Sequence, residues 1–401
     1  MPASQFVPQV PESPSGPGGS AGPGREPSAA PADPGPVIRG PADVVAAVPY
    51  LLGHHPSQSL VVLSVRPGAA LGVVCRIDLP DPAGGEAASA DVVERLVGAA
   101  VADGADSALV LVYDEDPGAG GHGDGGDLVD AVVDGLRGRG VGVTDVLHVG
   151  PQRWRSRWCD DGRCCPPEGR PVAESRDRPV AARFVLDGRS PAPDRSSVEP
   201  PAAAAPVAAR RAAAQAAARW RRRVAAGGSS ELPVSDRFRL LDEWLGVLDR
   251  HGSSGELPSP AVVGRLAAAW SQDLRTRDAC LVAVLPGAGP APDSIVAGSR
   301  IDLSSVLADR SCAGAVGAAA PVLRHMAAHL SGPPAAAVLA VHAWLAWVSG
   351  QGAAAGDLAS RASAAGSGHR LATLVLRALD HAVAPDWAAP AGPVTSSGAG
   401  S

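Results

Sequence analysis

Residues Val48 to Pro67, VPYLLGHHPSQSLVVLSVRP, contain the stretch that decides the fold of this 401-residue chain. Within it, Ser59 to Val65 is a nearly continuous apolar run rich in β-branched residues, which is typical of a strand buried on both faces. A turn with one glycine and one proline precedes the run and brackets two histidines. The sequence therefore predicts that Ser59–Val65 forms the dry middle of a mixed sheet, with His54 and His55 at one end of the strand.

A short helix is predicted before this turn. Pro41 stands where the first helical turn tolerates proline, and Asp43 and several apolar residues follow it. Pro49 lacks a backbone N–H and disfavours helical geometry at the residue before it. We therefore expect this helix to kink or to end at Pro49.

Strands and helices alternate after the turn. Strands are predicted over 71–79, 108–113 and 143–149, and helices over 86–102, 127–137 and 180–186. Such alternation indicates an α/β layer that contains parallel strand pairs and at least one antiparallel hairpin. We therefore predict an α/β domain over residues 37–188, in which helices flank a mixed sheet.

The composition changes outside this domain. Residues 1–36 are rich in Pro, Gly and Ser and have no apolar block, so they fit neither a signal peptide nor a folded segment. Residues 388–401 are similar, and both ends are predicted to be disordered tails. The Pro/Ser/Arg/Ala-rich residues 189–206 indicate an interdomain linker, and residues 207–387 have the pattern of an α-helical domain.

Many helices are predicted in this second domain. One is capped by Ser235 and closed by Gly252, one begins at Pro260, and others cover 207–225, 271–285, 302–309, 313–330, 335–348, 353–365 and 369–383. The last three have a period of about 34 residues and resemble one and a half tetratricopeptide-type repeats. An ordinary hairpin of Ala-rich helices has much the same pattern, so both alternatives stay open.

Three segments resemble a known family. They are IRGPADVVAAVPYLLGHHPSQSLVVL (38–63), RWRSRWCDDGRCCPPEGRPV (153–172) and AVHAWLAWVSGQGAAAGDLASRASAAGSGHRLATLVL (340–376). Together they are similar to an actinobacterial family catalogued as a domain of unknown function (number 4192). The resemblance implies a shared fold over most of residues 37–387. It implies no activity, so no catalytic residue is carried over from it.

Composition and charge restrict the class of protein. All 35 basic residues are Arg, and neither Lys nor Asn occurs, which is typical of a GC-rich coding sequence. The net charge of -6 argues against a globally basic nucleic-acid binder. The longest apolar run, 335–348, is too short to span a bilayer. We therefore expect a soluble cytoplasmic protein without membrane contact, in which the six cysteines stay mostly reduced and do not form three disulfides.

Three acidic residues follow the strand predicted over 108–113. Asp114, Glu115 and Asp116 stand where open α/β sheets place ligands, and such carboxylates serve as metal ligands or as a general base. His54 or His55 would complete a catalytic site there if the strand ends meet. The alternatives without a functional role are a solvated acidic turn and histidines that pack at a strand end. The pattern favours these alternatives.

Three cysteines are the most unusual local feature. Cys159, Cys164 and Cys165 have the spacing C-x4-C-C, which is not that of a zinc knuckle. With His148, the nearest histidine upstream, they offer four ligands for a tetrahedral zinc ion. Adjacent cysteines seldom both reach one ion, however, so zinc is not the favoured cofactor.

Two other roles are open to these cysteines. A redox pair of the first cysteine with either of the others is one, because Arg157 and Arg163 would favour thiolates. A buried turn packed by Trp154 and Trp158 is the other, and the pattern favours it.

Two arginine-rich segments raise the question of anion binding. The first contains Arg153, Arg155 and Arg157, which alternate with other residues and so lie on one face of a strand. This pattern indicates either an anion-binding surface or an edge strand whose charges prevent further pairing, and we prefer the edge strand. The helix over 207–225 carries its own arginines: Arg210, Arg211, Arg219, Arg221, Arg222 and Arg223, with Trp220 among them. Nucleic-acid contact is one interpretation, and a solvated helix between domains is the preferred one.

The sequence contains no complete set of catalytic residues, and its last helices resemble a repeat. Our first hypothesis is therefore a non-enzymatic protein-interaction or scaffold protein that binds another protein through residues 207–387. The alternative is a small-ligand or metal-dependent enzyme with its site at the strand ends. Nucleic-acid binding through the arginine-rich helix is the weakest of the three.

Overall fold

The structure of the chain is a computed structural model. It describes residues 38–68, 70–79, 85–114, 124–186, 188–227, 231–309, 311–312 and 316–388. The tail predicted over 1–36, and all but the first residue of the tail predicted over 388–401, lie outside the described residues.

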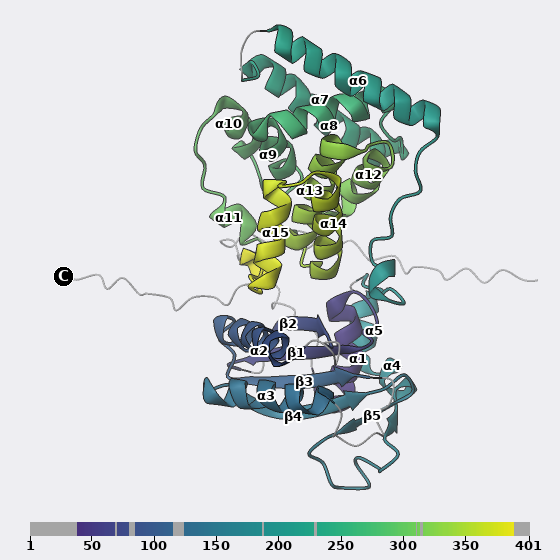
Figure 1. The fold of residues 1–401 in the computed structure, drawn as a ribbon, viewed down its shortest axis with the longest axis vertical. Coiled ribbons are helices and arrows are strands. Elements are labelled where there is room, and N and C mark those ends of the chain that lie inside the picture. The colour runs from purple at the N-terminus through teal and green to yellow at the C-terminus, as the bar shows by residue number, and fades with distance from the viewer. Residues whose placement is uncertain are drawn as a thin grey trace, which may run out of the picture. The chain divides into compact units, whose positions relative to one another are not determined.

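A mixed sheet with the strand order β2-β1-β3-β4-β5-β6 organises the first part of the chain (Figure 1). Its strands are β1 (Ser59–Arg66), β2 (Ala70–Asp78), β3 (Ser107–Tyr113), β4 (Gly142–Val149), β5 (Arg153–Ser156) and β6 (Arg170–Pro171). β1 pairs antiparallel with both β2 and β3, whereas β3 and β4 are parallel. β4, β5 and β6 continue antiparallel, so the predicted mixed sheet is confirmed.

β1 is buried on both faces, as its apolar run predicts. Leu60 and Val62 pack into one apolar cluster, and Val61 and Leu63 pack into another on the opposite face. Alternating side chains of one strand therefore face two separate cores, which is why four consecutive positions, Leu60 to Leu63, are apolar. The middle of the sheet nevertheless lies at β3 and β4, because only β2 separates β1 from the edge.

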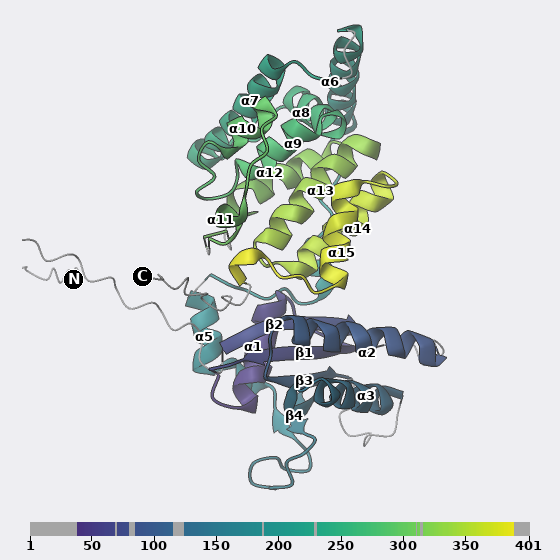
Figure 2. The same ribbon diagram turned by 90° about the vertical axis from the view of Figure 1, so that its left-hand side faces the viewer.

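Helices cover both faces of the sheet. α2 (Gly85–Ala102) and α3 (Asp124–Gly138) lie side by side and contribute to the cluster that holds Leu60 (Figure 2). α1 (Pro41–Leu52) covers the other face and contributes Val44, Val45 and Val48. α4 (Ala173–Arg176) and α5 (Pro179–Leu186) follow β6, and α5 packs against α1.

The prediction that α1 ends at Pro49 is wrong, and a kink at that residue stays a prediction. The helix continues through Pro49 to Leu52 and stops at Gly53, whose φ of 79° is left-handed. Glycine adopts this conformation without the steric cost that other residues have. Gly53 therefore sets the direction in which the chain leaves α1 towards the two histidines.

The second part of the chain is helical. Its helices are α6 (Val207–Ala226), α7 (Val234–Ser254), α8 (Pro260–Gln272), α9 (Leu274–Val282), α10 (Ala291–Ala297), α11 (Ser304–Leu307), α12 (Val316–Ala328), α13 (Gly332–Val348), α14 (Gly352–Ala365) and α15 (Arg370–Asp380). Trp244 and Trp270 meet edge to face in its core, with ring centroids 5.1 Å apart. The Trp244 indole donates a hydrogen bond to the carbonyl of Cys280. Short 3-10 turns cover Arg195–Ser197 and Asp386–Ala388.

Some predicted helix ends are wrong. α7 runs past Gly252 and stops at Gly255, which has the left-handed φ of 73° that ends a helix. α9 begins only after Asp273, whose side chain accepts a hydrogen bond from the Thr276 amide and caps the helix. α10 is not predicted at all. α13, α14 and α15 pack on one another, but their likeness to tetratricopeptide repeats stays a prediction.

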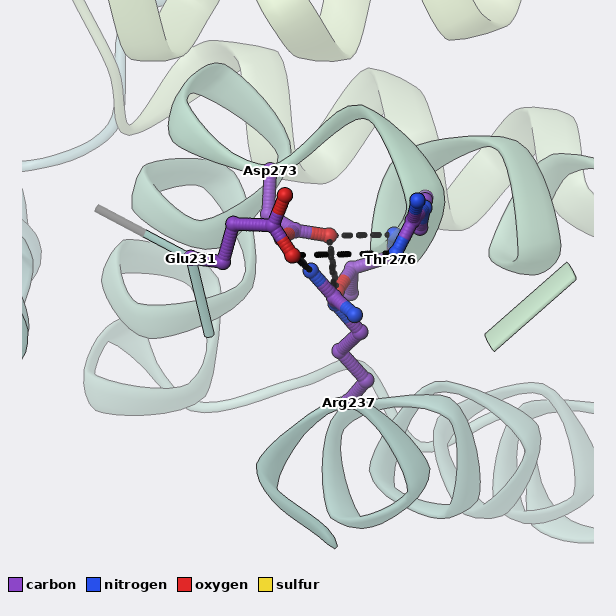
Figure 3. Close-up of polar contacts among 5 residues, drawn as sticks. Glu231, Arg237, Asp273 and Thr276 are labelled. Carbon is purple, nitrogen blue, oxygen red and sulfur yellow. Dashed lines mark hydrogen bonds and ion pairs between the residues drawn. The ribbon is translucent and has the colours of Figure 1, made fainter. Parts of the chain in front are cut away.

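A buried polar network joins α7 to the start of α9 (Figure 3). The Arg237 guanidinium donates hydrogen bonds to both carboxylate oxygens of Asp273 at 3.0–3.2 Å. Asp273 also accepts from the amide and the hydroxyl of Thr276, at 2.7 and 2.9 Å. Glu231 lies 3.7 Å from the same guanidinium. The full set of bonds on Asp273 explains how a charged pair is accommodated in an otherwise apolar helix layer.

Candidate functional site

A cleft of about 540 Å³ lies where β3 and β4 end. Tyr113 is the last residue of β3, Val149 is the last residue of β4, and both line the cleft. The two strands are parallel, so their carboxyl ends meet at one edge of the sheet, the position at which α/β sheets bind ligands. The other lining residues are Val45, Ala46, Pro49, Tyr50, His55, Pro56, Gly150, Pro151, Val172, Ser175 and Arg176.

Local hydrogen bonds fix the walls of this cleft. The amide of His55 donates to the carbonyl of Ala192 at 3.0 Å, and the amide of Gly150 donates to the carbonyl of Arg153 at 2.8 Å. On the α1 side, the Tyr50 ring stacks on Phe184 with centroids 5.4 Å apart. The wall residues are therefore held in place by contacts outside the cleft.

Three polar groups in the cleft have capacity to bind a ligand. The hydroxyl of Tyr113 is buried and has no hydrogen-bond partner among the described residues. Arg176 is exposed, and no acidic group of the described chain forms an ion pair with it. Partial burial, and then the charge of Arg176, lower the pKa of His55, so its imidazole is neutral at pH 7. A phenol, a guanidinium and a neutral imidazole together suit a small ligand that has an anionic group.

His54 has a different position from its neighbour. Its side chain is buried and does not line the cleft; its Nδ1 lies 3.2 Å from the carbonyl oxygen of Leu52. Burial is the main cause that lowers its pKa. This placement fits the packing role that the sequence favours, and it leaves His55 as the histidine of the cleft.

Asp114 does not join His55 in the cleft. Asp114 is exposed, its amide donates to the carbonyl of Val149, and it is not among the residues that line the cleft. Its carboxylate acts instead on His148, where it opposes the lowering of the pKa that burial and two arginines cause. Glu115 and Asp116 lie outside the described residues. The catalytic group predicted from Asp114, Asp116 and a histidine is therefore not assembled in the described part of the chain.

The three cysteines of the loop after β5 come together. The sulfur atoms of Cys159, Cys164 and Cys165 all lie within 4.8 Å of one another, although two of the residues are adjacent in sequence. His148, on β4 opposite Arg155, is not part of this cluster. The loop therefore brings the sulfur atoms of two adjacent cysteines close to the same point, an arrangement that the sequence does not favour.

One of the two arginines expected to activate these thiols is engaged elsewhere. Arg157 forms two hydrogen bonds to Asp130 on α3, at 2.8 and 3.1 Å. Burial, and then the neighbouring sulfur atoms, raise the pKa of Cys165 to about 11 despite a hydrogen bond from the Ser156 amide. A protonated thiol is a poor nucleophile, so a redox pair is not favoured. The turn is also less packed than expected, because Trp158 is exposed.

The prediction that residues 153–157 form an edge strand is wrong. β5 pairs with β4 on one side, and at Arg153 and Trp154 it pairs with β6 on the other. The left-handed Gly169 turns the chain back after the cysteine loop and supplies this extra strand. The side chain of Arg153 donates to the carbonyl of Gly169, so it is used within the sheet.

α6 presents its arginines to solvent but not its tryptophan. Trp220 is buried in the helical core, and Arg223 lies over its ring and bonds to Asp236. On the buried face, α6 approaches α8 so closely that a Cβ atom at Gly264 would come within 2.0 Å of the carbonyl oxygen of Ala213. The indole is therefore not available for base stacking, which weakens the nucleic-acid hypothesis.

The sequence did not identify the residues that now matter most in the cleft. Tyr113 has a signal, because it is one of only two tyrosines and ends a buried strand. Arg176 and Ser175 have none, since they lie more than sixty residues further along the chain and reach the cleft only through the β4–β5–β6 pairing. Tyr113 is thus the cleft residue that carries a signal in the sequence.

Among the described helices, none combines the length and the hydropathy that crossing a bilayer requires. No curated protein and no solved structure gave a significant match to the chain. A family model described as "Domain of unknown function (DUF4192)" matches residues 41–386, which include both the strand-end cleft and the cysteine loop. The chain therefore belongs to this family of unknown function.

Proposed function

We propose that the α/β region binds a small organic molecule with a carboxylate or phosphate group in the cleft at the ends of β3 and β4. The observation that carries this proposal is the buried Tyr113 hydroxyl, which has no partner within the described chain and lines the cleft together with Arg176. A buried hydroxyl without a partner costs free energy, and a ligand that bonds to it removes that cost.

The lining of the cleft supports this class of ligand. Most of the wall is apolar, and its volume is within the range typical of pockets for small molecules. Arg176 supplies a permanent positive charge that can form two parallel hydrogen bonds to a carboxylate or phosphate. The hydroxyl of Ser175 donates to the carbonyl of Val172 at 2.6 Å, so it offers an acceptor to the ligand.

Binding is better supported than catalysis. Asp114, the carboxylate predicted as a general base, is not among the lining residues, so His55 has no acidic partner among the residues that line the cleft. Among the titratable residues that line the cleft, only His55 has a pKa that its surroundings in the described chain lower from the usual value. We therefore infer a ligand sensor or carrier, with an enzyme that uses His55 as the second candidate.

A ligand screen on the full chain tests this proposal. Small carboxylates and phosphate esters are added one at a time, thermal unfolding is followed, and hits are titrated by calorimetry. We expect Arg176→Gln to weaken binding of a hit about tenfold or more, and Tyr113→Phe to weaken it by a few-fold, because each removes one hydrogen bond to the ligand.

Arg95→Gln is the matched control for this experiment. Arg95 is exposed on α2, where it donates to the carbonyl of Asp91 in its own helix. Its replacement removes the same charge from the same region and should leave the affinity unchanged. Equal weakening by Arg95→Gln and Arg176→Gln, or the absence of any stabilising compound in the panel, would count against the cleft as the site.

Partner binding through residues 207–387 and nucleic-acid binding through α6 stay predictions from the sequence. A pull-down with the full chain tests the first. A gel shift at low and moderate salt tests the second, because contacts to phosphates weaken as salt rises. Charge reversal at Arg221 and Arg222, both exposed on α6, gives the matched variant for both experiments.

We also infer an actinobacterial source and a cytoplasmic location. The absence of Lys and Asn from the whole chain supports a GC-rich genome. All six cysteines are free thiols, and thiols stay reduced in the cytoplasm. Fractionation of a native host, followed by immunoblotting, tests the location.

A further inference from the structure

The loop between β5 and β6 carries a cluster of three sulfur atoms that the cleft does not use. Cys159, Cys164 and Cys165 lie within 4.8 Å of one another and are the one group of three or more His, Cys, Asp or Glu ligand atoms with this spacing in the described chain. We propose that these three cysteines bind a thiophilic divalent metal ion, Zn²⁺ in the first place, and leave one coordination position open.

Hydrogen bonds to the backbone hold the first cysteine in place. The Ser156 hydroxyl accepts from the amides of Trp158 and Cys159, at 3.2 and 3.1 Å, and donates to Asp145 on β4 at 2.7 Å. Ser156 is itself a buried residue of β5. The start of the loop is therefore anchored to the sheet, and the position of Cys159 is set by that anchor.

A second set of hydrogen bonds brings the other two cysteines back towards the first. The amides of Cys164 and Cys165 both donate to the carbonyl of Asp161, at 3.0 and 2.7 Å. The side chain of Asp161 accepts from the amide of Arg163 at 2.9 Å. The turn thus closes on itself, which explains how two adjacent residues present their sulfur atoms to the same point.

The spacing of the sulfur atoms suits a metal ion. Zinc–sulfur bonds of ~2.3 Å at tetrahedral angles place the sulfur atoms roughly 3.8 Å apart. This separation is within the 4.8 Å that the three sulfur atoms do not exceed in the structure. Two thiols would suffice for a disulfide, and the third has no role in one. When the ion binds, it displaces the protons of the three thiols into solvent and takes three thiolates as ligands.

The fourth ligand is not supplied by the described chain. No further His, Cys, Asp or Glu of the described residues has its ligand atom within the same distance of all three sulfur atoms. Cys164 is exposed, so solvent or a small molecule reaches the ion. Structural zinc sites are closed by four protein ligands, whereas an open position lets an ion bind an exchangeable ligand. We therefore assign an exchangeable fourth ligand, water or a small molecule, to this site.

Metal analysis of the full chain is the experiment. The protein is purified without chelator, its zinc content is measured by mass spectrometry, and the chelated protein is titrated with Co²⁺. We expect a single metal ion per chain and a sulfur-to-cobalt charge-transfer band. The band reports thiolate ligands in the wild-type chain, so this result does not depend on whether a variant folds. Cys159→Ser, Cys164→Ser and Cys165→Ser should each abolish stoichiometric binding and that band.

Two control variants separate the site from other effects. Cys312→Ser alters a buried cysteine outside the cluster, whose thiol bonds to the carbonyl of Val306, and should leave metal content and spectrum unchanged. His148→Gln should leave both unchanged as well, because His148 is outside the cluster. Substoichiometric zinc without a cobalt band, or a disulfide between two of the three cysteines in protein purified without oxygen, would overturn the proposal.

Discussion

Arg237 and Asp273 form a buried ion pair between α7 and the residue that caps α9. Their side chains lie 3.0 Å apart, and only 3% and 8% of the two residues' surfaces are exposed. Asp273 uses the same carboxylate to hold the first turn of α9 through Thr276. One carboxylate therefore fixes both the start of a helix and the position of its neighbour.

Removal of the positive partner should be strongly destabilising. In Arg237→Met the Asp273 carboxylate keeps its bonds to Thr276 but is left as a buried charge without a cation, so we expect a loss of about 3–5 kcal/mol in the free energy of unfolding. Urea denaturation measures it. Arg239→Met is the control, because Arg239 is exposed and pairs only at the surface with Asp236. Similar urea midpoints for the two variants would show that the buried pair contributes little.

His342 on α13 should make the protein less stable in weak acid. Burial is the first cause that lowers its pKa to about 4, and Arg324 and Arg361 also lower it while Glu199 opposes them. The unfolded chain binds a proton near pH 6.5, but the folded chain does so only near pH 4. Stability should therefore fall as the pH drops from 6.5 to about 4, by on the order of 3 kcal/mol.

Unfolding at a series of pH values checks this contribution. His342→Leu should flatten the slope of stability between these pH values, since the titrating group is gone. His381→Gln, at the exposed end of α15, should leave the slope in place. An unchanged slope in His342→Leu would assign the acid sensitivity to other groups.

Two glycines within helices should respond to alanine with opposite signs. At Gly264 a Cβ atom would overlap the backbone carbonyl of Ala213, which cannot move without separating α6 from α8, so Gly264→Ala should cost about 1–3 kcal/mol or more. At Gly252 in α7 the same atom meets nothing within 4 Å among the described residues. Gly252→Ala should therefore stabilise by about 0.5–1 kcal/mol. Thermal unfolding of both variants gives the comparison, and a stabilising Gly264→Ala would contradict the close packing of α6.

Asp43 should stabilise the fold only at pH values at which its carboxyl group is ionised. Burial alone would raise its pKa, but hydrogen bonds from Arg178 at 2.6 Å and from the Arg39 amide at 2.8 Å outweigh this and lower it. The contribution is complete above the unfolded pKa near 3.8 and is lost as the pH falls through the lower folded value. Asp43→Asn should be less stable than the wild type at pH 7, and the difference should shrink in strong acid.

Much of the α/β region follows from local signals. The apolar runs of β1 and β3 predict buried strands because apolar side chains on both faces of a strand have to be shielded from water. The pairing of β5 with β6 could not be predicted in this way, since it depends on the turn at Gly169, and β6 is only two residues long. The local sequence pattern thus predicts the buried strands but not the pairing of β5 with β6 at one edge of the sheet.

The candidate site was predicted only in outline. The sequence pointed to the edge of the sheet at which the cleft lies, and His55 does line the cleft there. Arg176 was missed, because the contact between the segment after β6 and the end of β3 leaves no trace in local composition. The convergence of the three cysteines was considered but not favoured, since it depends on backbone bonds to Asp161 rather than on residue spacing.

The short strand β6 has a consequence for behaviour at high concentration. Its second residue, Pro171, has no amide hydrogen, so an extended segment of another molecule would find almost no donors at this border of the sheet. Proteins avoid intermolecular β-aggregation by such blunted borders. Growth of the sheet from one molecule to the next is therefore disfavoured at β6.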